Sequence, residues 1–141
     1  MTHVLDTNIL SDLIKANYRL VARFEAVPET DRFVTTTVTR YEILRGRYAA
    51  ILAAADKGQL LLAQRRLSDD ESWLAHIAVL PVTPAAADHF ERLCTAKKHK
   101  KIGRGDILIA SIAPAERATL VTRNTKDFVH IPGLMLENWA D

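Results

Sequence analysis

The sequence predicts an α/β fold, a three-layer α/β/α sandwich around a mainly parallel sheet. Short apolar runs rich in β-branched residues alternate along the chain with longer segments of helical periodicity. Polar residues, including Asp6 and Asn124, follow some of these runs, where the carboxyl ends of parallel strands collect ligand-binding groups. With 141 residues, 48% of them hydrophobic, the chain is expected to form one domain over residues 1–141.

The first part of the chain predicts two strands separated by two helices. Residues 4–5 form the first strand, and Asn8 is expected to cap a helix whose apolar residues share one face. A second helix ends before Pro28. Residues 33–36 have the aromatic and β-branched content of the second strand.

The middle of the chain predicts consecutive helices. A long helix begins at about Val38 and is interrupted at residues 56–58. Another helix passes through Leu67, and the capping-box spacing of residues 68–71 predicts that a further helix starts around Trp73.

A third strand over residues 79–82 lies at or near a sheet edge, because Pro81 cannot donate to a neighbouring strand. Thr83 and Pro84 have the capping and first-turn character that opens a helix. Cys94 falls in the apolar pattern of this helix and is expected to be a buried small hydrophobe.

The last part of the chain predicts a glycine-rich turn at residues 103–106 and an apolar helix over 107–113 that Pro114 ends or kinks. Residues 119–122 form a strand, and a polar turn separates it from a last short strand near 134–136. The alternation of strands and helices therefore continues to the end of the chain.

Composition excludes some classes of protein. The net charge of +2 provides no global attraction to a polyanion. The single cysteine allows no internal disulfide, which suits a reducing compartment. No apolar run approaches the ~20 residues that span a bilayer, so a soluble, cytoplasmic protein without a membrane partner is expected.

Four acidic residues lie where a strand ends or a helix begins, namely Asp6, Glu42, Asp106 and Asp127. All four can therefore line one edge of the predicted sheet. Clustered carboxylates suit Mg²⁺ or Mn²⁺, which prefer oxygen ligands. Such ions activate water and stabilise the attacking and leaving oxygens of a phosphodiester. The five histidines show no metal-ligand spacing.

Each acidic residue also has a purely structural interpretation. Asp6 and Asp106 are ordinary helix caps, Glu42 completes a capping box with Thr39, and Asp127 is a common turn residue. Chance readily explains one acidic residue at this edge of the sheet, but it is a poor explanation for all four.

At these positions the chain resembles the PIN-domain family. Residues 5–8 (Leu-Asp-Thr-Asn), Glu42 followed by Leu44 and Gly46, and Asp106 before Ile-Leu-Ile-Ala carry the resemblance. The tail, residues 120–139, is similar to that of the VapC toxins of bacterial toxin–antitoxin pairs. The resemblance spans nearly the whole chain and is weakest from about residue 56 to 78.

The resemblance implies a compact metal-dependent endoribonuclease that hydrolyses RNA with metal-activated water, using Mg²⁺ or Mn²⁺. It assigns the first three acidic metal ligands to Asp6, Glu42 and Asp106. Family members are commonly homodimers and are held inactive by a cognate antitoxin protein, so DNA is reached only through the antitoxin.

The fourth acidic position is where this chain departs from the family pattern. Many relatives have an aspartate where this chain has Asn124, whereas others have an acidic residue three positions later, as Asp127 is here. Asn124 is expected to hold a water on the metal or to position Asp6, and Asp127 to supply the charge.

Two further segments have a structural and a functional interpretation. The basic run 97–101, with Arg104, is either a solvated helix end or a phosphate-guiding rim beside Asp106, and we favour the rim. Residues 60–62 and Trp73, Leu74 and Ile77 are expected to be mostly core, although such helices can also form a groove for an antitoxin segment.

Two alternatives to the nuclease remain open. A non-catalytic RNA- or partner-binding module that retains the fold is conceivable because of Asn124. Phosphoryl transfer through an aspartyl phosphate on Asp6 is disfavoured, because Thr7 and Asn8 stand where a second acidic residue is expected.

Overall fold

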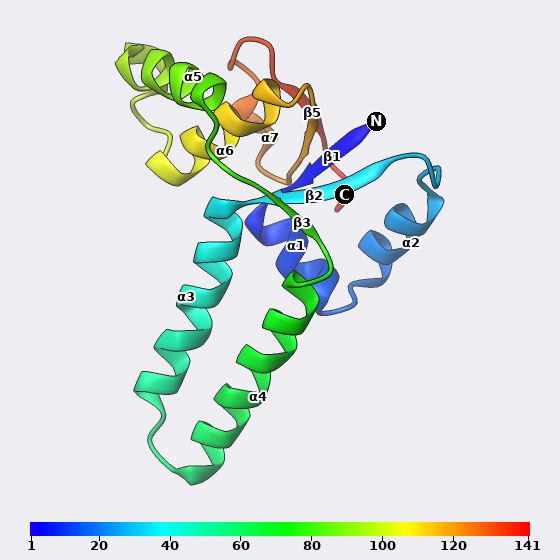
Figure 1. Cartoon of the computed structure of the whole chain (residues 1–141), viewed down its shortest axis with the longest axis vertical. Helices are drawn as coiled ribbons and strands as arrows, with labels where there is room; N and C mark the ends of the chain where they lie inside the picture. Colours follow the sequence, from blue (N-terminus) through cyan, green and yellow to red (C-terminus); the bar gives the residue numbers. More distant parts are fainter.

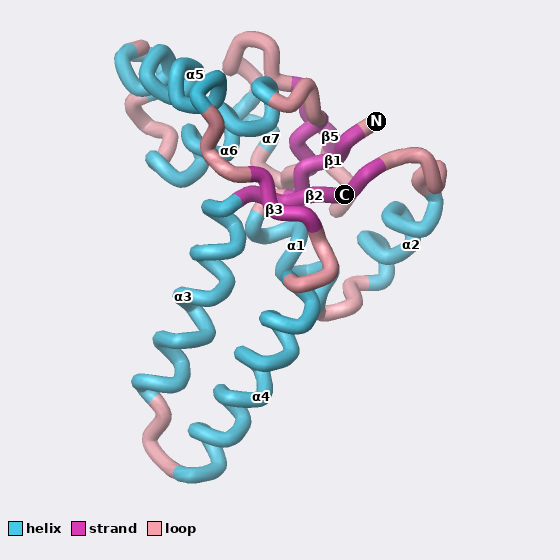
Figure 2. Tube along the Cα trace, viewed as in Figure 1, coloured by secondary structure: helices cyan, strands magenta, loops and turns pink.

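The computed structural model describes residues 1–141 and contains one five-stranded, all-parallel sheet (Figures 1 and 2). The strands are β1 (Thr2–Leu5), β2 (Arg32–Thr36), β3 (Ala78–Leu80), β4 (Thr119–Val121) and β5 (Met135–Glu137). The helices are α1 (Thr7–Ile14), α2 (Tyr18–Ala26), α3 (Thr37–Ala53), α4 (Lys57–Leu74), α5 (Pro84–Thr95), α6 (Arg104–Ala115) and α7 (Thr125–Phe128), with a 3₁₀ turn at Lys97–His99. None of these helices is long and apolar enough to cross a membrane.

The strand order β3-β2-β1-β4-β5 places β1 at the centre and β3 at an edge, as Pro81 predicted. In β1, Val4 aligns with Val34 of β2 and with Leu120 of β4. All three side chains are fully buried. Because β1, β2 and β4 are parallel neighbours, their carboxyl ends lie together at one edge of the sheet.

Helices cover both faces of the sheet, and a separate apolar cluster fills each interface. One cluster joins Val4 and Leu120 to Ile109 of α6 and Phe128 of α7. The other joins Leu5 and Val121 to apolar residues of α1, α2 and α4 and to Trp139. Figure 1 shows α5, α6 and α7 on one side of the sheet and α1 and α2 on the other. The predicted three-layer α/β/α sandwich is therefore confirmed.

Helices α3 and α4 form a long hairpin that projects away from the sheet (Figure 1). Near the sheet, Arg47 of α3 donates a hydrogen bond from its Nε to Asp70 of α4, whose side chain is buried. The prediction that a new helix starts after residues 68–71 was wrong, because α4 continues through them to Leu74. Ser68, the cap in that prediction, lies inside α4, and Asp70 pairs with Arg47.

The apolar residues of α4 divide between core and surface. Leu67 and Leu74 are buried, whereas Leu60, Leu61 and Leu62 are exposed. The expectation of core positions was therefore wrong for residues 60–62, because this half of α4 lies beyond the layers that cover the sheet (Figure 1).

Several predicted caps were assigned to the wrong residue. Asp6, and not Asn8, caps α1. Thr36 caps α3, so Glu42 lies in the second turn of that helix and does not complete a capping box with Thr39. Gly103 is the N-cap of α6, and Asp106 lies in its first turn.

The expectation for Cys94 was also wrong, because its side chain is exposed. Helix α5 buries Ala86 and Leu93 instead, and the residue that follows Leu93 points to another side of the helix.

The predictions for two prolines in helices were confirmed. Pro84 stands in the first turn of α5, and Pro114 stands in the last turn of α6, one residue before that helix ends.

Candidate active site

Asp6 lies directly after β1, at the centre of the sheet edge. Its Oδ1 accepts a hydrogen bond from the backbone N–H of Ile9 at 2.9 Å and so caps α1. Only 8% of the residue is exposed. The strand and the cap therefore hold this carboxylate in one place. Its other oxygen, Oδ2, takes no part in the cap.

Glu42 projects from the second turn of α3 toward the beginning of α6. One of its oxygens, Oε1, lies 3.5 Å from the position that a Cβ would take on Gly105. A Cβ at position 105 would be in ordinary van der Waals contact with this carboxylate, so α3 and α6 lie close together here. Glu42 is thereby placed beside Asp106, the next residue of α6.

Asp106 is half-buried in the first turn of α6. Gly103 provides no side chain to cap this helix, so the first N–H groups have no side-chain acceptor at the N-cap. A carboxylate in the first turn is favoured by the partial positive charge of the helix end. The apolar face of α6 is packed against the sheet, and this fixes the position of Asp106.

Asp127 lies in the short helix α7, shortly after β4. Its Oδ2 accepts a hydrogen bond from Nδ2 of Asn124 at 2.7 Å. The backbone N–H of Asn124 in turn donates to the hydroxyl of Thr122, the residue after β4, at 3.0 Å. Asn124 therefore positions Asp127, and its side-chain contact is not with Asp6.

The carboxylates perturb one another electrostatically. Burial raises the pKa of Asp6, and the negative charge of Asp106 raises it further, whereas the Thr122 hydroxyl, the Ile9 N–H and Arg123 act in the opposite direction. Burial and then Asp106 also raise the pKa of Glu42.

Burial raises the pKa of Asp106 as well, and the charge of Asp127 adds to this shift. Each of the four predicted acidic residues is thus coupled electrostatically to at least one of the others. Neighbouring carboxylates with raised pKa values form an electrostatically unfavourable cluster, which a cation would stabilise.

The donor set fits a hard divalent cation, because it offers carboxylate oxygens and no histidine or cysteine. As they stand, no three acidic, histidine or cysteine side chains are close enough together to hold one ion. Ion binding therefore requires the carboxylates to turn toward a common point. Asp106 is the shared member, because it perturbs both Asp6 and Glu42.

Threonines surround the carboxylates, and the sequence did not single them out. The Oγ1 atoms of Thr7 and Thr39 lie 3.1 Å apart and join α1 to α3. Thr35 donates from its hydroxyl to the backbone oxygen of Leu5 at 2.9 Å and joins β2 to β1. The sequence signal was present, because Thr7 and Thr122 each stand within two residues of a strand end.

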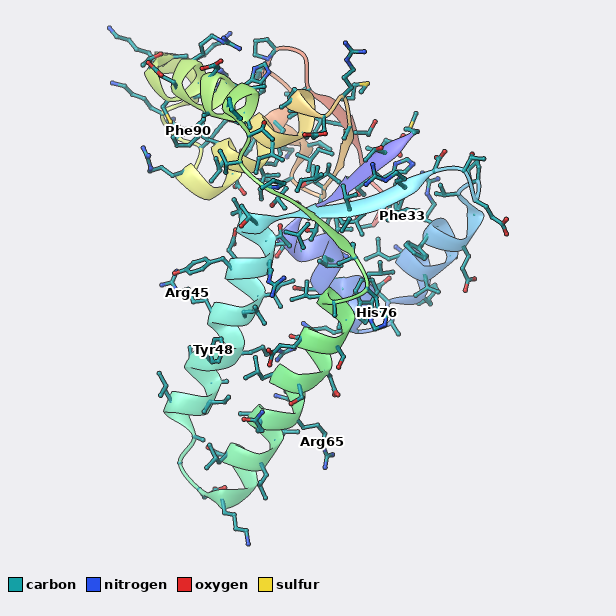
Figure 3. The ribbon with its side chains drawn as sticks, viewed as in Figure 1. Phe33, Arg45, Tyr48, Arg65, His76 and Phe90 are labelled. Carbon is teal, nitrogen blue, oxygen red and sulfur yellow. The ribbon has the colours of Figure 1, made fainter.

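Arginines lie at the rim of the cluster. Arg123 contacts Asp12 of α1 at 3.3 Å and also lowers the pKa of Asp6. Arg45, one turn beyond Glu42, acts in the same direction on that residue, and Figure 3 shows it on α3. The guanidinium of Arg104 lies 5.0 Å from the ring centroid of Phe90. Arg123 and Arg45 thus bring positive charge to the carboxylates, whereas Arg104 packs on Phe90 of α5.

Comparison with known proteins identifies the same architecture elsewhere. The family model described as PIN domain matches residues 3–134. A relative from Shigella flexneri named tRNA(fMet)-specific endonuclease VapC is 30% identical, with 97% of each chain covered. Ribonuclease VapC2 of Haemophilus influenzae is 28% identical, with 99% of each chain covered.

Solved structures give a concordant result. A chain in the crystal structure of VapBC2 from Rickettsia felis, bound to a fragment of promoter DNA, has a TM-score of 0.81 at 29% identity, with 99% of both chains covered. A chain of VapBC-1 from nontypeable Haemophilus influenzae has a TM-score of 0.80 at 25% identity over the full length of both chains. This chain belongs to the PIN-domain family, and its relatives within that family include VapC ribonucleases.

Proposed function

We propose that this protein is a metal-dependent endoribonuclease that acts as the toxin of a toxin–antitoxin pair. The observation that supports the proposal most strongly is the cluster of Asp6, Glu42 and Asp106, whose pKa values are raised by burial and by the negative charge of neighbouring carboxylates. Perturbed carboxylates gathered at the carboxyl edge of a parallel sheet mark a functional site.

We assign the metal to Asp6, Glu42 and Asp106, with Asp127 completing the negative charge. Mg²⁺ or Mn²⁺ bound here would act as a Lewis acid and as the source of a hydrolytic nucleophile. The side chains themselves bind and orient. Asp6 is held by β1 and the α1 cap, and Asn124 holds Asp127 through its amide. No covalent bond to a carboxylate is required.

The substrate is RNA, as the names of the VapC relatives indicate for those proteins. Arg45 and Arg123 act on the carboxylates, and Arg104 stands two residues before Asp106; there they can bind the phosphates that flank the scissile bond. A carboxylate cluster alone would repel RNA, so these cations are needed for the substrate to approach.

The partner is a cognate antitoxin protein, and DNA contact occurs through that protein. The VapBC structures similar to this chain are complexes of this kind, one of them bound to promoter DNA. The chain has exposed apolar residues at Leu60, Leu61 and Leu62 of α4 and at Tyr41, Tyr48 and Leu52 of α3. Exposed apolar surface of this extent is suited to a protein partner.

Expression of this chain, with an Asp106→Asn variant as control, tests the function. We expect the wild type to generate RNA fragments with defined ends, mapped by sequencing, and the variant to generate none. A calorimetric titration with Mn²⁺ should show binding to the wild type and weaker binding to the variant. Equal cleavage by both proteins would contradict the assignment. Metal binding without any RNA cleavage would favour the non-catalytic alternative.

A further inference from the structure

A cavity lies on the α5–α6 side of the sheet, and none of the four carboxylates lines it. It has a volume of about 490 Å³ and is bounded by α5, the turn at Lys97–His99, the second half of α6 and residues 131–133. Figure 1 shows α5 and α6 side by side in this region. A cavity of this size lies within the range of small-molecule binding sites.

The lining of the cavity carries positive charge and hydrogen-bond donors. Arg92 and Lys98 contribute cations, and none of the eleven lining residues has a carboxylate. Nη2 of Arg92 lies 2.9 Å from Nδ1 of His89. Because a guanidinium only donates, Nδ1 of His89 is the acceptor in this contact. Arg92 is otherwise exposed.

His99 adds a buried polar group to the same lining. The residue is 3% exposed, and its Nε2 has no hydrogen-bond partner. A buried nitrogen without a partner is unfavourable, because it has lost its hydrogen bond with water. Burial first, and then the charges of Lys98 and His130, lower the pKa of His99. The surroundings of this ring therefore carry an excess of positive charge.

We propose that this cavity binds a phosphate group of the RNA strand whose cleavage occurs at the carboxylate cluster. The inference rests on the proposed function and adds a second point of contact with the substrate. The lining includes Ala110 and Pro114 of α6, four and eight residues beyond Asp106. At 1.5 Å per residue they lie only about 6 and 12 Å along the helix axis.

The basic run 97–101 supports RNA as the occupant over an acidic peptide. It connects the end of α5 to the segment that precedes Asp106, and Lys98 and His99 of this run line the cavity. Positive charge thus continues from the cavity to the beginning of α6. A strand that enters the active site can follow this charge, because single-stranded nucleic acids bind along basic grooves.

The test measures RNA binding in EDTA, so that no cleavage occurs. A fluorescein-labelled single-stranded RNA of about twelve nucleotides, within the usual site sizes, is titrated with wild type, Arg92→Gln and Lys98→Gln at several salt concentrations. Arg65→Gln is the matched control, because it removes the same charge from an exposed residue of α4, remote from the cavity (Figure 3).

We expect Arg92→Gln and Lys98→Gln each to weaken binding and to reduce the slope of log K against log salt by about 0.7, the value for one lost phosphate contact with a single strand. Arg65→Gln should leave the slope unchanged. Equal slopes for Arg92→Gln, Lys98→Gln and Arg65→Gln would overturn the proposal. If that result is found while the wild type still cleaves RNA with Mn²⁺, only the cavity assignment fails. A wild type that neither binds nor cleaves RNA would overturn both proposals.

A second measurement distinguishes the source of the phosphate. Inorganic phosphate and a hexaglutamate peptide are each added to the wild type while the histidine ring signals are followed by NMR. Phosphate should move the signals of His89 and His99 and leave that of His76 in place, and the RNA should move the same two signals at far lower concentration. A response to the peptide at lower concentration than to RNA would overturn the assignment, as would a response to phosphate with none to RNA.

Discussion

Asp6 has two separable tasks, and a series of substitutions distinguishes them. Its Oδ1 caps α1, and its charge contributes to the carboxylate cluster. Asparagine caps a helix about as well as aspartate and lacks the charge, whereas alanine loses both. Asp6→Asn therefore removes the charge only, and Asp6→Ala also removes the cap.

The two variants should differ in stability by the free energy of the cap. Loss of an N-cap costs about 1 kcal/mol, so Asp6→Ala should unfold about 2–4 °C below Asp6→Asn in a protein of this size. Both should show RNA cleavage reduced by more than the roughly 100-fold that loss of an outer-shell partner causes. Thermal unfolding and a fluorogenic RNA assay measure the two effects.

The pH dependence of stability provides an internal check. A carboxyl whose pKa is raised on folding binds more protons in the folded state. Its contribution to the free energy of unfolding therefore falls as pH rises from its unfolded-state pKa through its folded-state pKa. Wild type should therefore be less stable than Asp6→Asn at neutral pH. The difference should shrink as pH falls toward the ordinary value of 3.8. A fully active Asp6→Asn, or one that loses as much stability as Asp6→Ala, would refute the reasoning.

Three further predictions concern the surroundings of the site. Mn²⁺ at 100 times its dissociation constant should stabilise the wild type by about 2.7 kcal/mol, and differential scanning fluorimetry should show a smaller gain for Asp106→Asn at the same concentration. Reversing the charge of Lys100 and Lys101 together should raise KM for RNA and leave kcat nearly unchanged; a loss confined to kcat would contradict a phosphate-guiding role. Arg47→Ala should lower the free energy of unfolding in urea by about 2–3 kcal/mol, because it leaves the buried Asp70 unpaired. The double variant with Asp70→Ala should recover part of that loss.

The layered fold could be predicted because the residues that determine it are local signals. The β-branched run at 33–36 lies in β2 and Pro84 begins α5, as the sequence pattern predicts, whereas Pro81 follows β3, which ends at Leu80. The errors concern competition between neighbouring groups. Residues 68–71 have the spacing of a capping box, but Arg47, which is distant in sequence, draws Asp70 into the helix pair and α4 continues.

The burial of apolar residues on α4 could not be read from the sequence for a related reason. Leu60, Leu61 and Leu62 have the composition of core residues, yet the hairpin extends beyond the sheet and nothing in the chain covers them. Cys94 is exposed because α5 needs only one buried stripe. Hydrophobicity identifies residues that are suited to burial, and the tertiary arrangement decides which of them are buried.

The fourth corner of the site shows what the structure adds to the sequence. The sequence assigned separate roles to these residues: Asn124 was expected to hold a water or to position Asp6, and Asp127 to supply the charge of the fourth carboxylate. In the structure they form a unit, because the amide of Asn124 donates to the carboxylate of Asp127, while Asn124 is itself held by Thr122. The charge of Asp127 then reaches Asp106, whose pKa it raises. An aspartate at 124 would lack the donor and repel Asp127, so the asparagine is the residue that allows the charge to stand three positions later.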